Sequence, residues 1–231
     1  MFIDTHVHSA GASRCARSTV EEIIDFKIKL GYDGMILTNH VQPWYCYNQE
    51  YSQIVADAES EYEKGLEHLE KIGEKHFKFL FGAEITITLP RHSDILIYGD
   101  VLPFLKKHDK LCDVTQQTLF EYCKEDGLVM VQAHPRREGM DFLDPSYLSG
   151  VEVNCSPRDL ATHPAVIDFA DKNNLILTCG TDTHFTAMTT RGGMIVPDDI
   201  CVCSDFAAYL KTTDFTQIRI DDKQFKHDTK R

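Results

Sequence analysis

Short apolar runs alternate with longer segments of helical periodicity along most of the chain. Eight runs are dominated by apolar residues that do not alternate with polar ones, and they predict buried strands at 2–7, 34–40, 78–89, 94–99, 128–135, 150–157, 175–184 and 217–221. Helical patterns fill most of the intervals, at 18–31, 49–76, 114–127, 163–174 and 204–211. Because strands that alternate with helices form parallel sheets covered on both faces, the pattern predicts an α/β fold.

Local signals support this organisation. Ser18 or Thr19 can cap the first helix, and Gly65 is a point at which the long charged segment 49–76 can be interrupted. Seven or so strand–helix units predict either a barrel or a doubly wound sheet. The chain has no internal repeat, low-complexity stretch or linker, so we expect a single domain over 1–231.

Composition and charge narrow the class of protein. The 231 residues carry a net charge of −12, which disfavours broad, non-specific binding to nucleic acid. No apolar run approaches the ~20 residues of a membrane span, and no leader pattern precedes the first strand. The eight cysteines are scattered without a CxxC pair, which predicts reduced thiols. We therefore expect a cytoplasmic protein that does not bind membranes.

Histidine and acidic residues follow five of the apolar runs. His6 and His8 stand two residues apart, so their side chains lie on the same face of the first strand. Each position alone has an ordinary explanation as a satisfied core histidine or a helix cap. Five such positions at one edge of a sheet favour an active site, because parallel strands place their carboxyl ends together. The remaining members of this set are His40, Glu84, His134, Asp182 and His184.

Five histidines and two acids exceed what one tetrahedral metal uses. Imidazole nitrogen and carboxylate oxygen suit zinc, manganese or iron, so the set predicts two or three divalent metals. Glu84, alone at its strand end, is the candidate bridge between them. Such a cluster activates a hydroxide and clamps phosphoryl oxygens. The chain carries no G-x-S-x-G, Walker or G-x-G-x-x-G motif that would indicate a competing chemistry.

The motif set resembles the PHP family, named for polymerase and histidinol phosphatase. The resemblance spans nearly the whole chain and implies a distorted (β/α)7 TIM-like barrel, with a bi- or trinuclear metal site at its carboxyl rim and metal-dependent phosphoester hydrolysis. It rests on five motifs in the family's order: DTHVHS (4–9), TNH (38–40), GAE (82–84), AHP (133–135) and GTDTH (180–184).

Ligand roles follow from this resemblance one residue at a time. Glu84 and Asp182, with the His6–His8 pair, would hold the first metal, and Glu84 with His134 would hold the second. His40 and His184 would hold the third metal. The residues expected to take part in catalysis are Glu84, Asp182 and His134.

Three positions depart from the family pattern. Asn39 stands where the family often has Asp, next to a ligand and not at one. Cys15 occupies the region of a further family ligand, either as a thiolate or as a small buried cysteine. Asp94 stands at the place of a family histidine, with His92 two residues earlier, and is either a ligand of the second metal or a cap at a strand start.

Arginines flank the expected rim and suit phosphate oxygens through their forked geometry. Arg136, directly after AHP, is the first choice for binding a phosphate, and Arg17 is the second. Asn154 ends another strand and is expected to orient substrate or a ligand. Arg14, Arg137 and Arg158 also flank the rim.

The leading function is hydrolysis of a small phosphomonoester or diester by a metal-activated hydroxide. Within the family, the alternatives are a nuclease or phosphatase acting on short oligonucleotides or nucleotides, a histidinol-phosphate phosphatase and a protein-tyrosine phosphatase. An amidohydrolase-like enzyme and a non-catalytic metal-binding regulatory module are other classes. We expect a small phosphorylated substrate and no stable nucleic-acid complex, because the basic segment 226–231 reads as a frayed tail. The oligomeric state stays open.

Overall fold

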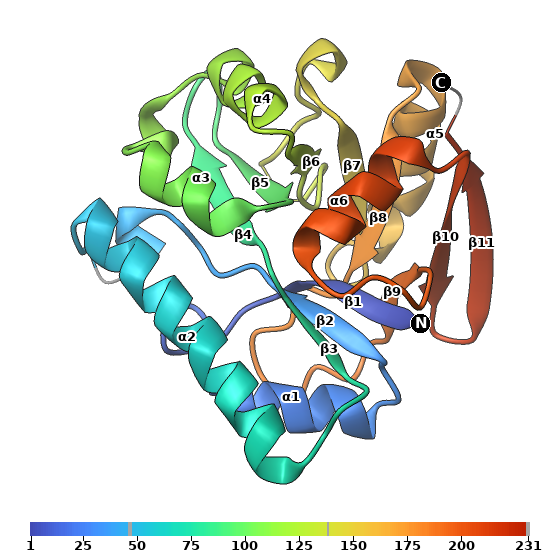
Figure 1. The fold of residues 1–231 in the computed structure, drawn as a ribbon. Coiled ribbons are helices and arrows are strands. Elements are labelled where there is room, and N and C mark those ends of the chain that lie inside the picture. Colours follow the sequence, from blue (N-terminus) through green and yellow to red (C-terminus); the bar gives the residue numbers. More distant parts are fainter. Residues whose placement is uncertain (46–47, 138, 230–231) are drawn as a thin grey trace.

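A computed structural model describes residues 1–45, 48–137 and 139–229 (Figure 1). The described residues form eleven strands, six α-helices and four short 3-10 turns. The strands are β1 (Phe2–Val7), β2 (Gly34–Leu37), β3 (Lys78–Phe81), β4 (Ala83–Ile87), β5 (Ser93–Tyr98), β6 (Val129–Gln132), β7 (Gly150–Asn154), β8 (Ile176–Gly180), β9 (Gly192–Ile195), β10 (Phe215–Ile220) and β11 (Lys223–Asp228). The helices are α1 (Val20–Lys29), α2 (Tyr51–Ile72), α3 (Val101–Lys107), α4 (Gln116–Glu125), α5 (His163–Asn173) and α6 (Cys203–Thr212). The turns are η1 (Pro43–Tyr45), η2 (Leu111–Asp113), η3 (Pro145–Tyr147) and η4 (Leu160–Thr162).

The strands form two mixed sheets. The first has the order β11-β10-β9-β1-β2-β3, and the second has the order β4-β5-β6-β7-β8. Pairing is parallel through β1, β2 and β3 and again through β6, β7 and β8. It is antiparallel on both sides of β5 and throughout β9, β10 and β11. The α/β class is therefore confirmed, whereas the expectation of an all-parallel sheet is wrong.

The two sheets meet at two seams. At one seam β3 and β4 are successive stretches of chain broken at Gly82, and His40 pairs with Glu84 in a single parallel bridge. At the other seam Val7 pairs with Thr183, again in one bridge. Among the described residues the strands thus form no continuously closed barrel. Gly82 lets the chain pass from β3 to β4 close to β2, because a Cβ at this position would lie only 3.0 Å from the side chain of Ile36.

Helices cover the outer faces of both sheets (Figure 1). Thr19 caps the start of helix α1: its hydroxyl accepts a hydrogen bond from the amide N–H of Glu22, and the Glu22 carboxylate accepts one from the amide N–H of Thr19. Its apolar face packs on β1 and β2, and α3, α4 and α6 lie over the second sheet. Because the strands are buried on both faces, non-alternating apolar runs are what these positions require.

Several local predictions need correction. Helix α2 runs without a break through Gly65, which lets the helix approach β3 closely, since a Cβ there would lie 2.2 Å from the Phe79 ring. The sequence pattern missed α3, β9 and β11. The expected tail is instead strand β11 as far as Asp228, and residues 230–231 lie outside the described part of the chain. None of the helices in the described segments is long and apolar enough to cross a membrane.

Candidate metal centre

The histidines and acids predicted as ligands come together where the two sheets meet. His6 and His8 lie at the end of β1, and His40 follows β2. The other ligand candidates come from the second sheet. All are buried except His184, which is partly exposed. The members from the second sheet are Glu84 on β4, Asp94 on β5, His134 after β6, and Asp182 and His184 after β8.

The direction of β5 explains how Asp94 reaches this place. Asp94 lies near the start of its strand, but β5 runs antiparallel to both neighbours, so its start lies beside their ends. Its Oδ1 accepts a hydrogen bond from the Thr86 hydroxyl at 2.6 Å, and its Oδ2 lies 3.8 Å from His134 Nε2. His92 lies outside the ligand cluster, with its ring stacked on that of Trp44.

Glu84 lies at the middle of the cluster. Its Oε1 is 3.3 Å from His6 Nε2 and 3.2 Å from His134 Nε2. Its Oε2 is 3.2 Å from His8 Nε2 and 3.0 Å from His40 Nδ1. A carboxylate with two imidazoles on each oxygen has the arrangement that a bridging ligand needs.

Asp182 presents one oxygen to the cluster and the other to an arginine. Its Oδ1 lies 3.3 Å from His6 Nε2, 3.2 Å from His8 Nε2 and 3.4 Å from His184 Nδ1. Arg137 Nη1 donates to Oδ2 at 2.7 Å. The backbone of Asp182 has φ +55°, and a non-glycine residue in this left-handed region is held there by its surroundings.

The close approach of these donor atoms is better explained by metal binding than by a network of hydrogen bonds. His6 Nε2 and His8 Nε2 are only 2.9 Å apart, and both face the same two carboxylates. Four groups of nitrogen and oxygen donors each have their ligand atoms within 4.8 Å of one another. Buried N and O donors gathered in this way fit zinc, manganese or iron. The groups are His6–His8–Glu84, His6–His134–Asp182, Glu84–Asp94–His134 and His8–His40–His184.

The carboxylates dominate the electrostatics of the site. Burial alone would lower the pKa of His6, but the charges of Glu152, Glu84 and Asp182 outweigh it and raise that pKa well above its ordinary value. Burial would raise the pKa of Glu84, yet the neighbouring imidazoles hold it well below its usual range. The buried carboxylates therefore favour positive charge at this site, and at His6 above all.

His184 behaves differently from the other histidines. Burial and the charge of His8 lower the pKa of His184 to about 4. Its Nε2 lies 3.1 Å from Cys15 Sγ. Cys15 is exposed, so the alternative of a small buried cysteine is wrong. A neutral imidazole is the form that binds metal ions.

Glu152, which sequence reasoning missed, supports the ligands from behind. This fully buried carboxylate on β7 lies 2.9 Å from His6 Nδ1 and accepts the main-chain N–H of His134 at 2.9 Å. It also accepts a hydrogen bond from Asn154 Nδ2 at 2.9 Å. Asn154 thus orients Glu152 and lies behind the ligands. An acid inside the apolar run 150–154 was the available signal.

The arginines divide into two kinds. Arg137 is only 14% exposed and binds both Asp182 and Asp159. Arg136, the first choice for phosphate, is half-exposed and pairs with Asp141. Arg17 is exposed, with its guanidinium 5.7 Å from the Phe185 ring.

A buried ion pair lies beneath β1. Lys27 on α1 is fully buried and donates to Asp4 and to the Thr183 hydroxyl. Asp4 in turn accepts the main-chain N–H groups of His6 and Thr181. The pair therefore fixes the backbone of β1 and of the segment after β8, which carry His6, His8, Asp182 and His184.

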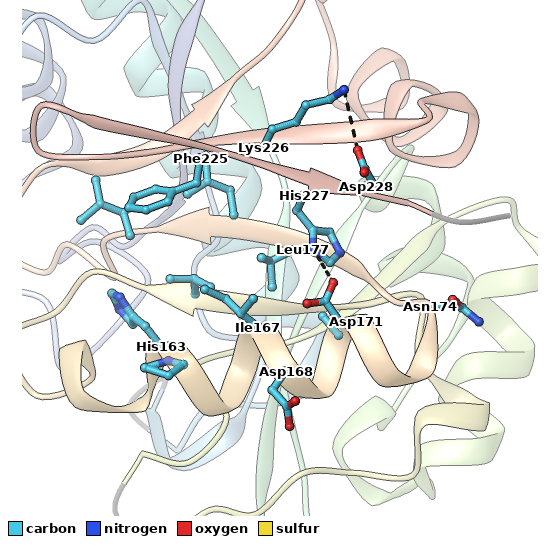
Figure 2. Close-up of a pocket in the computed structure, with 15 residues that line it drawn as sticks. His163, Ile167, Asp168, Asp171, Asn174, Leu177, Phe225, Lys226, His227 and Asp228 are labelled. Atoms are coloured by element: carbon cyan, nitrogen blue, oxygen red, sulfur yellow. Dashed lines mark ion pairs between the residues drawn. The ribbon is translucent and has the colours of Figure 1, made fainter.

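A separate cavity of about 780 Å³ lies between α5 and the β10–β11 hairpin (Figure 2). Figure 2 shows two ion pairs among its lining residues, His227 with Asp171 and Lys226 with Asp228. None of the ligand candidates lines it.

Comparisons with solved structures show the fold of this chain. No protein-family model and no curated protein sequence matches it. PsfC from Pseudomonas syringae is 19% identical with a TM-score of 0.64, over 90% of this chain and 87% of that one. A two-domain protein from Bacteroides vulgatus, described as containing a predicted PHP-like metal-dependent phosphoesterase, is 18% identical with a TM-score of 0.58. A lesion-specific endonuclease from Pyrococcus furiosus is 14% identical with a TM-score of 0.61. The chain spans 59% and 57% of these last two proteins, which cover 96% and 95% of it.

Proposed function

We propose that the chain is a metal-dependent phosphoesterase acting on a small phosphorylated substrate, since it shares its fold with a protein described as containing a predicted PHP-like metal-dependent phosphoesterase. The observation that carries the proposal is Glu84, whose two carboxylate oxygens lie within 3.3 Å of four imidazole nitrogens. Apolar side chains would hold the fold together better than these charged groups, because burying charges costs free energy. The cluster is therefore better explained by function than by stability.

Two or three divalent ions would be held by the eight ligand candidates. When bound, such ions lower the pKa of water and neutralise charge on phosphoryl oxygens. The ligand candidates are His6, His8, His40, Glu84, Asp94, His134, Asp182 and His184.

The chain's own residues would orient the reaction. Arg137 holds Asp182 Oδ2, so that Oδ1 faces His6 and His8. Arg17 would bind phosphate oxygens, since its guanidinium is exposed and its main-chain N–H bonds the carbonyl of His184. Arg136 would have to leave Asp141 to do the same.

A nuclease acting on short oligonucleotides or nucleotides is the second candidate. The endonuclease from Pyrococcus furiosus shares the fold, which supports this alternative. The net charge of −12 favours a small substrate over a long nucleic acid.

The test combines metal analysis with hydrolysis. Protein purified without chelator should contain two or three metal ions per chain and hydrolyse an aryl phosphate. His6→Ala and Asp182→Ala should lose metal and activity yet keep their far-ultraviolet circular dichroism. His68→Ala is the matched control, because that imidazole pairs with Asp25 on the surface. Turnover of a bis-ester alone would favour the nuclease, and hydrolysis unaffected by Asp182→Ala would refute the proposal.

A further inference from the structure

Aromatic rings lead from the metal centre to the surface. The rings of His8 and His40 are stacked with centroids 4.4 Å apart and planes 21° apart. Tyr45 stacks on His40 with centroids 4.5 Å apart and planes 16° apart. Trp44 meets the edge of Tyr45, with centroids 6.2 Å apart and planes at 82°. The ligand candidates are thus in direct ring contact with the turn η1.

Trp44 ends this series at the surface. Trp44 is 53% exposed, and its ring stacks on that of His92 with centroids 6.4 Å apart and planes 29° apart. His92 comes from the loop between β4 and β5, and therefore from the other sheet. One large ring is held from both sides of the seam and still presents much of its area to solvent.

The backbone beneath Trp44 is anchored. Its amide donates to Gln42 Oε1 at 2.7 Å, and the amide of Tyr45 donates to the Gln42 carbonyl at 3.0 Å. The amide of Arg14 donates to the Tyr45 carbonyl at 2.7 Å. An anchored backbone reduces the conformational freedom that this segment has to lose when a ligand binds the ring.

We propose that Trp44 and His92 form a subsite for a planar ring carried by the substrate, beside a phosphate held at the metal centre. The inference rests on the proposed phosphoesterase function and names the class of its substrate: a phosphoester whose organic part is an aryl group or a nucleobase. An exposed indole binds flat rings by stacking. Contact through His40 and Tyr45 joins the subsite to the ligand cluster.

The single tryptophan makes the subsite directly observable, because Trp44 is the only one in the chain. The metal-loaded protein is titrated with phenylphosphonate and with methylphosphonate, which carry the same charged group and are not hydrolysed at their C–P bond. Phenylphosphonate should quench the Trp44 fluorescence, and methylphosphonate should bind without quenching it.

Inhibition constants for the two phosphonates test the residue itself. Trp44→Leu should weaken phenylphosphonate about tenfold and leave methylphosphonate unchanged. Trp44→Phe should restore most of the loss, because it keeps a flat ring. Phe225→Leu is the matched control, since Phe225 is a similarly exposed ring on β11.

The outcomes separate the two proposals. Equal loss for both phosphonates, or no loss for either in Trp44→Leu, would overturn the ring subsite while leaving the phosphoesterase in place. If neither phosphonate binds the wild-type protein, the phosphoesterase is refuted, and the subsite with it. An adenosine methylenephosphonate then distinguishes the source: a larger Trp44 effect than for phenylphosphonate identifies a nucleobase, and a smaller one an aryl group.

Discussion

The substitution Glu152→Gln tests how the metal centre is supported and leaves every proposed ligand unchanged. Oε1 of Glu152 lies 2.9 Å from His6 Nδ1, and Oε2 accepts N–H groups from His134 and Asn154. The carboxylate thereby fixes the proton of His6 on Nδ1 and leaves Nε2 free for a metal. Gln keeps the volume of Glu and removes one acceptor.

Either orientation of the new amide is unfavourable. If its nitrogen faces His6, that ring must carry its proton on Nε2, which then cannot bind a metal. If its nitrogen faces His134 and Asn154, buried donors meet a donor, at a cost of about 1–3 kcal/mol for each unsatisfied group. Losing such an orienting partner typically weakens metal binding about 10- to 100-fold, or about 1.4 to 2.7 kcal/mol.

The assay is competition between the protein and a chelating dye for zinc or manganese at fixed pH. Glu152→Gln should show the stated loss of affinity while the metal-free variant stays folded. Glu61→Gln is the control, because Glu61 is also buried but binds Ser9 and Lys64. An unchanged dissociation constant in Glu152→Gln would refute the role of this carboxylate in setting the His6 tautomer.

Three further predictions follow from the same contacts. Lys27→Met should lower the free energy of unfolding, measured in urea, by about 3–5 kcal/mol, because it leaves the Asp4 carboxylate buried and unpaired. Adding Asp4→Asn to this variant should recover part of the loss. Full stability of the single variant would contradict the pairing. The raised pKa of His6 means that its contribution to the stability of the metal-free protein is complete below its unfolded pKa of about 6.5 and is lost as pH rises through its folded pKa. Metal must displace that proton, so metal affinity and the metal-induced rise in Tm should increase with pH, and calorimetry showing no proton release would argue against this. Arg137→Lys keeps the charge but loses the fork between Asp159 and Asp182, so kcat and metal affinity should fall with little change in KM; a rise in KM alone would instead indicate substrate binding.

The sequence predicted the ligand cluster because the strand ends carry a regular signal. His6, His40, Glu84, His134 and Asp182 each follow or end an apolar run, and buried strands of one topology bring such ends together. This reasoning needs only the period of a strand and the direction of its neighbours. It therefore placed the residues without any knowledge of side-chain packing.

The other parts of the site depend on direction or on packing. Asp94 was named from the family resemblance and not from the strand-end pattern: it reaches the site because β5 runs antiparallel, and nothing in a short apolar run states its direction. Arg137 and Arg136 are adjacent, and only the turn after β6, where Arg136 has φ +73°, decides which guanidinium lies inward. The sequence alone does not give the role of Glu152, because that role follows from the partners of its two carboxylate oxygens.

The position of the metal centre at the seams links binding to the integrity of the fold. Each seam has one bridge, His40–Glu84 or Val7–Thr183, so few backbone hydrogen bonds join the sheets there. Three of the four donor groups draw ligands from both sheets, and only Glu84–Asp94–His134 belongs to one. An ion held by such a group would cross-link the two sheets at a seam and would offset the charge of the buried carboxylates around it. Metal binding would then stabilise the closed seams by mass action, because the ligands come together only in the folded protein.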